Sequence, residues 1–416
     1  MAGGNARRSD MKGEAMLERA DRPIEEVMRA FAAHGVEVGF LVPTETGLAK
    51  SIMDAHGELR DYLRRVQLHD YECQAKGPAA KVVVTAKHVG PDTFEDATAS
   101  LYRPETKGGD PRIWVTALAR RAKAGNLLAL LALNGTLYVV NTSAPGVMES
   151  LGSPSAPLAR IVAAIKQAKG GPARELLGKL TEVAARGFVK SLRPGPTGVG
   201  MTLETLLGIE ANSSKSPDFK GIELKASRAS LGGRTTTNRA TLFSKVPDWK
   251  SSPLKSAVAL LQAHGYVRDG RRQLYCSLKH VPNSLGLHLA ADKDDLHVMS
   301  SRTEPNSRVL SWDMAGLRQA FLEKHRETFW VKAAVKKAAD GSESFHYTRV
   351  VHTRAPIVSG LESLFDRGHV ELDLLLHLMD RAPELPPRAR DHGYLFKMHP
   401  RDMDLVFPPS VTYALV

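Results

Sequence analysis

Apolar residues recur along the chain with two different spacings. In residues 24–33 they fall three and four positions apart, which predicts an amphipathic helix that ends before Gly35. The same spacing predicts a longer helix over residues 48–66. Between residues 81 and 141 the pattern changes to short runs rich in β-branched and aromatic residues, which predict strands at 82–85, 99–102, 112–115 and 137–140.

Proline, glycine and serine gather between residues 142 and 172 and mark a boundary. Within this stretch residues 158–169 are expected to form a short amphipathic helix that ends at Gly170-Gly171-Pro172. A chain of 416 residues exceeds one ordinary domain and predicts two. The expected division is a disordered tail at 1–20, a first domain at 21–145, a partly helical linker at 146–172 and a second domain at 173–416.

The second half carries two hairpin signals and one helical pattern. Asp269-Gly270 and Asp340-Gly341 each separate two runs typical of strands, so each predicts a tight β-turn. The leucine-rich run at 371–379 predicts a helix. The second domain is therefore expected to mix helices and strands.

The stretch from Pro217 to Lys225 carries the strongest candidate chemistry. Glu223 and Lys225 are separated by one apolar residue, so on a strand they project from the same face. Asp218 precedes Glu223 closely enough for a bend to bring both carboxylates to one ion, and hard oxygen ligands suit Mg²⁺. By itself this pattern is common on solvent-facing strands, so its surroundings decide its meaning.

Those surroundings form a longer motif. Residues 198–209 read G-V-G-M-T-L-E-T-L-L-G-I, and the residues that continue the motif are Asn212, Ser213, Pro217, Asp218, Phe219, Gly221, Ile222, Glu223, Leu224, Lys225 and Arg228. This block resembles the MvaI/BcnI restriction endonucleases and, more loosely, their relative MutH. The resemblance implies that Asp218 and Glu223 hold Mg²⁺ and that Lys225 orients or activates the attacking water. It also implies that Glu204 completes the acidic cluster, either as a group that supports the metal ligands or as a ligand to a second ion. Without the motif, an isolated glutamate would be interpreted as an exposed acid on a helix.

Stretches at 41–51, 68–71 and 100–114 resemble the effector-binding domain of EcoRII, a pseudobarrel akin to the plant B3 DNA-binding domain. Charged residues around Gly108-Gly109 suit a loop that reaches into a major groove, since Arg can bind guanine and Glu can accept from cytosine. A solvated hairpin tip is the alternative. The residues expected to contact DNA here are Lys50, Arg103, Glu105, Lys107 and Arg112.

Residues 386–397 resemble the D-H-G-x-x-F-[RK] recognition segment of the same nuclease family. Their side chains offer several donors and one acceptor to a G·C-rich site, and a local ion-pair cluster is the alternative. The expected DNA contacts of the nuclease domain are Arg388, Arg390, Asp391, His392, Lys397 and Arg228. Other histidines, such as His280, His352 and His377, are expected to be structural or to contact phosphate, and no catalytic histidine is expected.

Composition agrees with a protein that meets a polyanion. There are 57 Lys and Arg against 45 Asp and Glu, a formal net charge of +12. The two cysteines, Cys73 and Cys276, lack the spacing of a zinc site and imply no disulfide framework. The most apolar window, residues 127–140, is interrupted by Asn134-Gly135 and is too short to cross a bilayer. A reducing, cytoplasmic setting is expected.

Together the resemblances imply an α/β (α+β) chain: an N-terminal B3-like β-pseudobarrel with helices, then a PD-(D/E)xK nuclease with a mixed sheet flanked by helices. They imply a monomeric, type IIE-like restriction endonuclease that cuts double-stranded DNA at a CC(A/T)GG-type site and binds a second copy through its N-terminal domain. A cognate methyltransferase is a possible partner. The alternatives are a MutH-like nicking enzyme of DNA repair and a non-catalytic DNA-binding regulator. The EcoRII-like front half disfavours the first, and the complete acid and lysine set disfavours the second.

Overall fold

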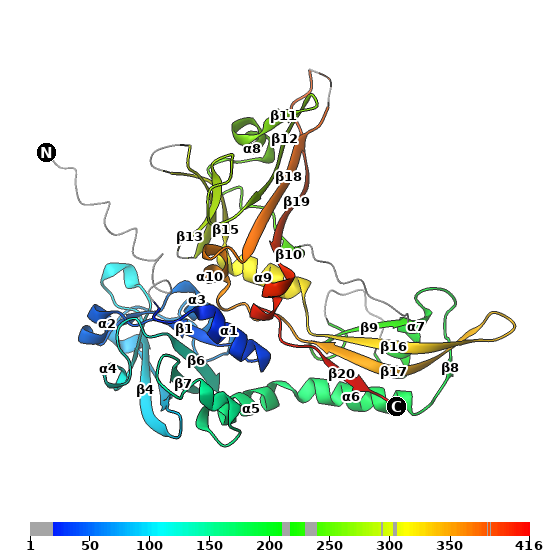
Figure 1. The fold of residues 1–416 in the computed structure, drawn as a ribbon, viewed down its shortest axis with the longest axis horizontal. Helices are drawn as coiled ribbons and strands as arrows, with labels where there is room; N and C mark the ends of the chain where they lie inside the picture. Colours follow the sequence, from blue (N-terminus) through cyan, green and yellow to red (C-terminus); the bar gives the residue numbers. More distant parts are fainter. Residues whose placement is uncertain are drawn as a thin grey trace.

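The computed structural model describes residues 20–209, 217–228, 239–292, 294–302, 306–380, 382 and 384–416. Apart from Ala20 the expected tail lies outside these residues, as do Asn212 and Ser213 of the nuclease motif. The elements form three lobes (Figure 1). We call residues 20–169 the N-terminal lobe, 239–325 with 354–410 the central lobe, and 171–228 with 326–353 and 411–416 the distal lobe.

A seven-stranded, mainly antiparallel sheet forms the N-terminal lobe, in the order β1-β6-β7-β3-β4-β5-β2. The four strands expected from the sequence are present, and Asn134 and Gly135, with φ of 49° and 75°, turn the β6–β7 hairpin. The strands are β1 Gly39–Leu41, β2 Met53–Asp54, β3 Val82–Val89, β4 Phe94–Tyr102, β5 Arg112–Val115, β6 Leu128–Leu133 and β7 Thr136–Asn141.

The helices of this lobe confirm one expectation and correct another. The helix expected at 24–33 is α1 (Ile24–Ala33). The single helix expected over 48–66 is instead α2 (Glu45–Lys50), β2 and α3 (Gly57–Arg65), with α4 (Leu118–Arg121) later in the lobe. Ser51 ends α2 in the left-handed conformation, and β2 then pairs with β5. A helical apolar spacing was present, but strand pairing determined the structure between the two helices.

Two consecutive helices lead from the N-terminal lobe to the distal lobe (Figure 1). The expected helix is α5 (Pro157–Lys169), and α6 (Gly171–Ala184) follows at once. Pro172 does not end the helical run, because a proline in the first turn of a helix removes no intrahelical hydrogen bond. The buried side chains of α5, including Leu158 and Ile161, join a core that also contains residues of the central lobe.

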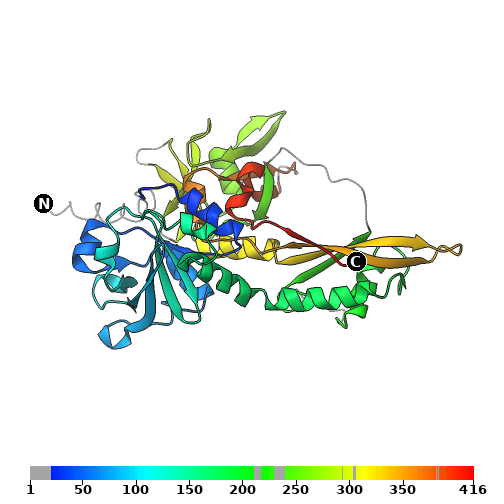
Figure 2. The ribbon, with the colours of Figure 1, turned by 60° about the horizontal axis from the view of Figure 1, so that its bottom comes forward.

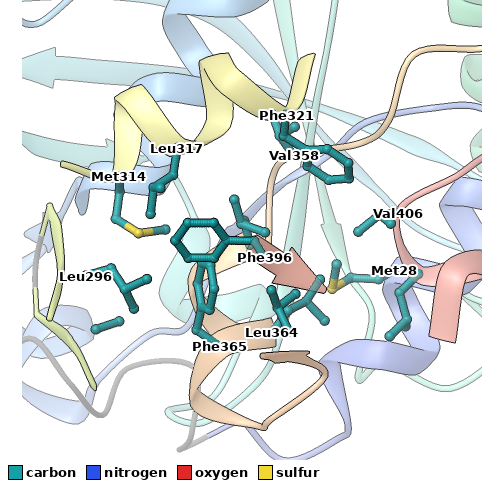
Figure 3. Close-up of a cluster of buried hydrophobic side chains, with 14 of the residues drawn as sticks. Met28, Leu296, Met314, Leu317, Phe321, Val358, Leu364, Phe365, Phe396 and Val406 are labelled. Atoms are coloured by element: carbon teal, nitrogen blue, oxygen red, sulfur yellow. The ribbon is translucent and has the colours of Figure 1, made fainter. Parts of the chain in front are cut away.

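The N-terminal and central lobes are packed against each other. Met28 of α1 lies among Leu364, Phe365 and Val406 of the central lobe (Figure 3). Arg318, which is 4% exposed, forms ion pairs with an acid of each lobe, Asp61 of α3 and Glu362 of the central lobe, the latter at 3.2 Å.

The central lobe contains two antiparallel sheets, in the orders β10-β19-β18-β12-β11 and β13-β14-β15. The Asp269-Gly270 hairpin is confirmed between β11 and β12. The elements of the central lobe are β10 Ala240–Ser244, α8 Ala257–His264, β11 Tyr266–Arg268, β12 Arg271–Leu278, β13 Leu287–Asp292, β14 Asp295–Ser300, β15 Ser307–Asp313, α9 Met314–Lys324, α10 Leu361–Asp366, β18 Val370–Leu378, β19 Ala389–Met398 and the 3₁₀ helix η4 Pro400–Leu405.

The helix expected at 371–379 is wrong, because this segment is β18. The strand lies between β12 and β19, and most of its residues are buried, including Leu374 and Leu376. A strand buried on both faces has a nearly continuous apolar run instead of an alternating one, and such a run is difficult to distinguish from a buried helix.

The distal lobe is a mixed sheet in the order β20-β17-β16-β9, and β8 also pairs with β17. The predicted Asp340-Gly341 hairpin is confirmed between β16 and β17. Buried residues of α6 and α7 pack on one face of this sheet and form a core of their own. The further elements are β8 Val189–Lys190, α7 Gly198–Leu206, β9 Glu223–Arg228, β16 Thr328–Lys337, β17 Glu343–Thr353 and β20 Val411–Ala414.

Two arms extend from the centre of the molecule in different directions. One contains β11, β12, β18 and β19, and the other contains the β16–β17 hairpin (Figure 1). After a turn of 60° the first arm still rises on the side of the distal sheet opposite α6 (Figure 2). No helix among the described residues is both long and apolar enough to cross a membrane.

Candidate active site

Strand β9 carries Glu223 and Lys225 on one face, as the alternating pattern predicts. Leu224 between them is buried in the core of the distal lobe, whereas Lys225 is exposed and Glu223 is partly exposed. β9 pairs in parallel with β16, and the N–H of Glu223 donates to the carbonyl of Glu327 at 2.8 Å. Both charged groups therefore stand on a strand that is held by a sheet on one side and by a core beneath it.

A tight turn brings Asp218 back to the start of β9. Lys220 and Gly221 have φ of 45° and 92°, and the backbones of Phe219 and Ile222 exchange hydrogen bonds of 2.8 and 2.9 Å. Glycine suits this conformation because a side chain at such a φ is strained. The carboxylate of Asp218 accepts a hydrogen bond of 2.7 Å from the N–H of Leu224, which holds it beside β9.

Glu204 of α7 completes an acidic cluster. Partial burial raises the pKa of Glu204, and the negative charges of Asp218 and Glu223 raise it further. Helix α7 is fixed to the sheet by Tyr347, whose hydroxyl donates to the carbonyl of Val199 at 2.8 Å. Three carboxylates, from a helix, a turn and a strand, are thus near enough to interact electrostatically at one edge of the distal sheet.

This cluster fits a hard divalent cation. Carboxylate oxygens are the ligands that Mg²⁺ prefers, and a cation would relieve the repulsion that the three acids exert on one another. Among the described residues no three His, Cys, Asp or Glu side chains form a ready metal cage. Mg²⁺ usually keeps water ligands and is held by one or two carboxylates together with substrate phosphates, so Asp218 and Glu223 are the residues that would hold it.

Two residues near the cluster were not expected from the sequence. The ammonium of Lys225 lies 5.2 Å from the centre of the Trp330 ring, and the Trp330 Nε1–H donates to Thr353 Oγ1 at 2.9 Å. A guanidinium nitrogen of Arg326 lies 4.0 Å from the Glu223 carboxylate. Trp330 lies in β16 and Arg326 lies just before it. Their position near the acids follows only from the pairing of β16 with β9, which the sequence does not show.

Arg228 contacts the protein's own backbone. Its guanidinium donates to the carbonyls of Pro196 and Gly195 at 3.1 and 3.0 Å and also pairs with Glu343. These bonds hold the segment before α7 against the end of β9. In this structure Arg228 therefore supports the position of α7, and its expected contact with DNA stays a prediction.

The recognition segment lies on β19 and just before it, in the arm of the central lobe. Its exposed polar residues are Arg388, Arg390, Asp391 and His392. His392 stacks on His377 with ring centres 5.2 Å apart, and His377 Nδ1 shares a hydrogen bond of 3.0 Å with the Tyr275 hydroxyl. The arm thus presents charged and aromatic side chains, together with the exposed apolar side chains of Val267, Met379 and Leu385.

Lys397 does not belong to that surface. Its ammonium lies 2.8 Å from the carboxylate of Asp373, which is 6% exposed as a residue. Arg239 pairs with the same carboxylate at 3.0 Å, and Ser277 donates to it at 2.6 Å. Lys397 therefore neutralises a buried acid inside the sheet. Its expected contact with DNA stays a prediction.

In the N-terminal lobe the two arginines expected to read bases are used internally. Arg103 donates to the carbonyls of Gly109 and Tyr71 at 3.0 and 3.3 Å. The side chain of Arg112 is 15% exposed and pairs with Asp54 across β5 and β2. Lys50 and Glu105 are exposed. The side chain of Lys107 lies outside the described residues.

Comparison with known proteins gives a family match and structural likenesses. The family model for "MvaI/BcnI restriction endonuclease family" matches residues 177–407. The complex of restriction endonuclease MvaI with cognate DNA is 19% identical, with a TM-score of 0.32, covering 58% of this chain and 98% of that one. MvaI in the absence of DNA is 18% identical, with a TM-score of 0.34 and coverages of 59% and 98%. No curated protein matches the chain.

The family match includes the whole of the site. Residues 177–407 contain α7, the turn at Asp218, strand β9 and the recognition segment, and they make up more than half of the 416 residues. The chain therefore belongs to the MvaI/BcnI restriction endonuclease family.

Proposed function

We propose that the chain is a Mg²⁺-dependent type II restriction endonuclease that hydrolyses double-stranded DNA at a CC(A/T)GG-type site. The observation that supports this most strongly is the electrostatic interaction of Glu204 with Asp218 and Glu223 at the start of strand β9, which also carries Lys225. Phosphodiester hydrolysis requires a metal site, a positioned water and a cation near the phosphate, and this cluster offers groups suited to all three.

Each residue of the cluster has a distinct role in the proposal. Asp218 and Glu223 would hold Mg²⁺, which when bound would polarise the phosphate and make a water more acidic. Lys225 is exposed beside them, where its ammonium orients the attacking water and offsets charge at the phosphate. Glu204, whose pKa is raised by partial burial and by the charges of both acids, either adjusts the charge of the site or is a ligand of a second ion.

Sequence reading is assigned to the arm of the central lobe. Arg390 and Asp391 are exposed on β19, and Arg388 and His392 are exposed beside them. Arginine pairs with the acceptors of guanine in the major groove, and Asp accepts from the amino group of cytosine, so this set suits a G·C-rich site.

We assign a second DNA copy to the N-terminal lobe, as in a type IIE enzyme. Its exposed Lys50 and Glu105 are available for that contact, whereas Arg103 and Arg112 support the lobe itself. The shared core of the N-terminal and central lobes offers a mechanical connection between the two DNA sites. We propose that one chain acts as a monomer, with a methyltransferase of the same specificity as its partner in the cell.

Digestion of plasmid DNA tests the proposal directly. Linear products with uniform ends at CC(A/T)GG sites are expected with Mg²⁺, and none with Ca²⁺ or with a chelator. Products that stop at nicked circles would instead support the MutH-like alternative. Cutting without sequence preference would remove the restriction assignment.

The N-terminal site needs a separate experiment on the full chain. Short cognate duplexes that cannot be cut are added in increasing amounts to a cleavable plasmid with a single site. Acceleration is expected if the second DNA binds the active arrangement more tightly than the inactive one. A rate that stays constant or only falls would show that the lobe does not activate cleavage.

A further inference from the structure

Helices α6 and α7 pack on one face of the distal sheet, and among the described residues the other face carries a band of cations. Burial alternates along its strands: Phe329, Val331 and Val350 are buried against α6 and α7, whereas Trp330 and Arg349 are exposed. Since side chains alternate between the two faces of a strand, the exposed residues share the other face. We call this surface the open face.

The pairing register places its cations on three adjacent strands. Lys332 of β16 stands opposite Ser227 of β9 and Arg349 of β17. Its ammonium donates to Ser227 Oγ at 2.8 Å. Lys225 lies one step along β9, opposite Trp330. Because neighbouring strands are roughly 5 Å apart, these cations span about 10 Å across the sheet.

The remaining residues of these rows are compatible with a polyanion. Three rows of paired residues cross the sheet from β9, and they begin at Glu223, Lys225 and Ser227. Apart from Glu223 and the three cations, the residues of these rows are neutral, namely Ser227, Thr328, Thr353, Trp330, Val351, Thr412 and Ala414. Glu223 is the one acid of these rows, and it stands at the edge of the sheet where the metal is expected. Positive charge therefore continues inward from the active site.

We propose that the open face is a track for the DNA backbone, on which Lys332 and Arg349 contact phosphates beyond the scissile one. The inference rests on the proposed function, because it places the duplex relative to the active site. The arm with the recognition segment rises from the same side of the sheet, opposite α6 (Figure 2). A duplex that lies along the open face is thus presented to both the acids and the arm.

Salt dependence of DNA binding tests this track, because each phosphate contact releases counterions. Binding is measured in Ca²⁺ over a range of salt for Lys332→Gln and Arg349→Gln. Each variant is expected to make the slope of log K against log salt shallower by about 0.9, equally for a cognate and a scrambled duplex. Arg349→Lys should keep the slope of the wild type.

Arg174→Gln is the matched control, since Arg174 is an exposed arginine on α6, which covers the opposite face. It should change neither slope nor cleavage. The proposal of a track is wrong if Lys332→Gln and Arg349→Gln have unchanged melting temperatures and the same salt slope as this control. It is also wrong if they weaken binding of the cognate duplex alone. Cleavage in Mg²⁺ is scored separately. A wild type that binds DNA but never cuts it would overturn the proposed function, while the slopes would still decide the track.

Discussion

At the scale of single residues, the site depends on where a few charges are held. Asp218 is tied by a hydrogen bond to the backbone of the strand that carries Glu223, so the two acids cannot separate without breaking that bond. Glu204 approaches from a different element, and the effect of both acids on its pKa shows that the three interact. Such crowding of like charges is unfavourable in a protein without a cation, and it is typical of functional sites.

The first prediction concerns these charges. Glu223→Gln, Lys225→Ala and Asp218→Asn should each slow cleavage by at least on the order of 100-fold, because metal and ammonium stabilise charge at the phosphate. Asp218→Asn keeps an oxygen that can accept from Leu224, so the turn should survive. Specific binding in Ca²⁺ should stay close to that of the wild type. An Asp218 or Glu223 variant with normal turnover would disprove the assignment.

The second prediction concerns the ring beside Lys225. Trp330→Leu removes the aromatic face that lies 5.2 Å from the ammonium. An exposed cation–π contact is weak, so kcat should fall about 2- to 5-fold. Trp330→Phe keeps a ring and should recover part of this loss. Equal kcat values for the Leu and Phe variants would show that the ring does not position Lys225.

At the scale of elements, the site needs a turn, a strand and a helix to keep their mutual positions. The alternation of β9 and the glycine at 221 are visible in the sequence and are found in the structure. The leucine run of β18 was misleading because it is buried on both faces. Local spacing thus predicts a half-exposed strand more reliably than a strand in the middle of a sheet.

The third prediction tests the turn as an element. Gly221→Ala puts a side chain at a φ of 92° and should destabilise the chain by about 1–2 kcal/mol. Gly341→Ala is the matched control, because Gly341 has a φ of 80° in the β16–β17 hairpin. Both variants should lower the melting temperature similarly. Only Gly221→Ala should slow cleavage, because it displaces Asp218. Equal cleavage rates for the two variants would mean that the turn does not position this acid.

At the scale of the whole molecule, the N-terminal and central lobes are joined by polar contacts as well as by their core. His369 lies 3.4 Å from Glu25 of α1 and 3.3 Å from Asp402 of η4. Hydrogen bonding to Glu25 raises the pKa of His369, and the bond with His369 lowers the pKa of Glu25 to about 2. The cations Arg367, Arg29 and Arg401 also face these two acids, at 3.2, 3.8 and 3.7 Å.

The fourth prediction follows from the signs of these shifts. A raised His pKa contributes stability that is complete below the unfolded value of 6.5 and is lost as the pH rises through the folded value. The lowered pKa of Glu25 contributes stability that is complete above the unfolded value of 4.5. This stability is lost as the pH falls toward the folded value of about 2. His369→Gln should therefore reduce the melting temperature more at about pH 6 than above about pH 8. A reduction that does not depend on pH would show that the imidazolium is not part of this contact.

The sequence by itself determined the parts of this protein that depend on neighbours in the chain. The acid and lysine motif, the alternation of β9, the hairpin turns and α1 can be read from it, because spacing sets which side chains share a face. It did not reveal that Arg103, Arg112, Arg228 and Lys397 bind the protein itself, or that Trp330 stands beside Lys225. Those contacts join residues far apart in the chain. Only the tertiary structure decided them, since a buried acid or carbonyl must be satisfied by whichever cation the fold brings near.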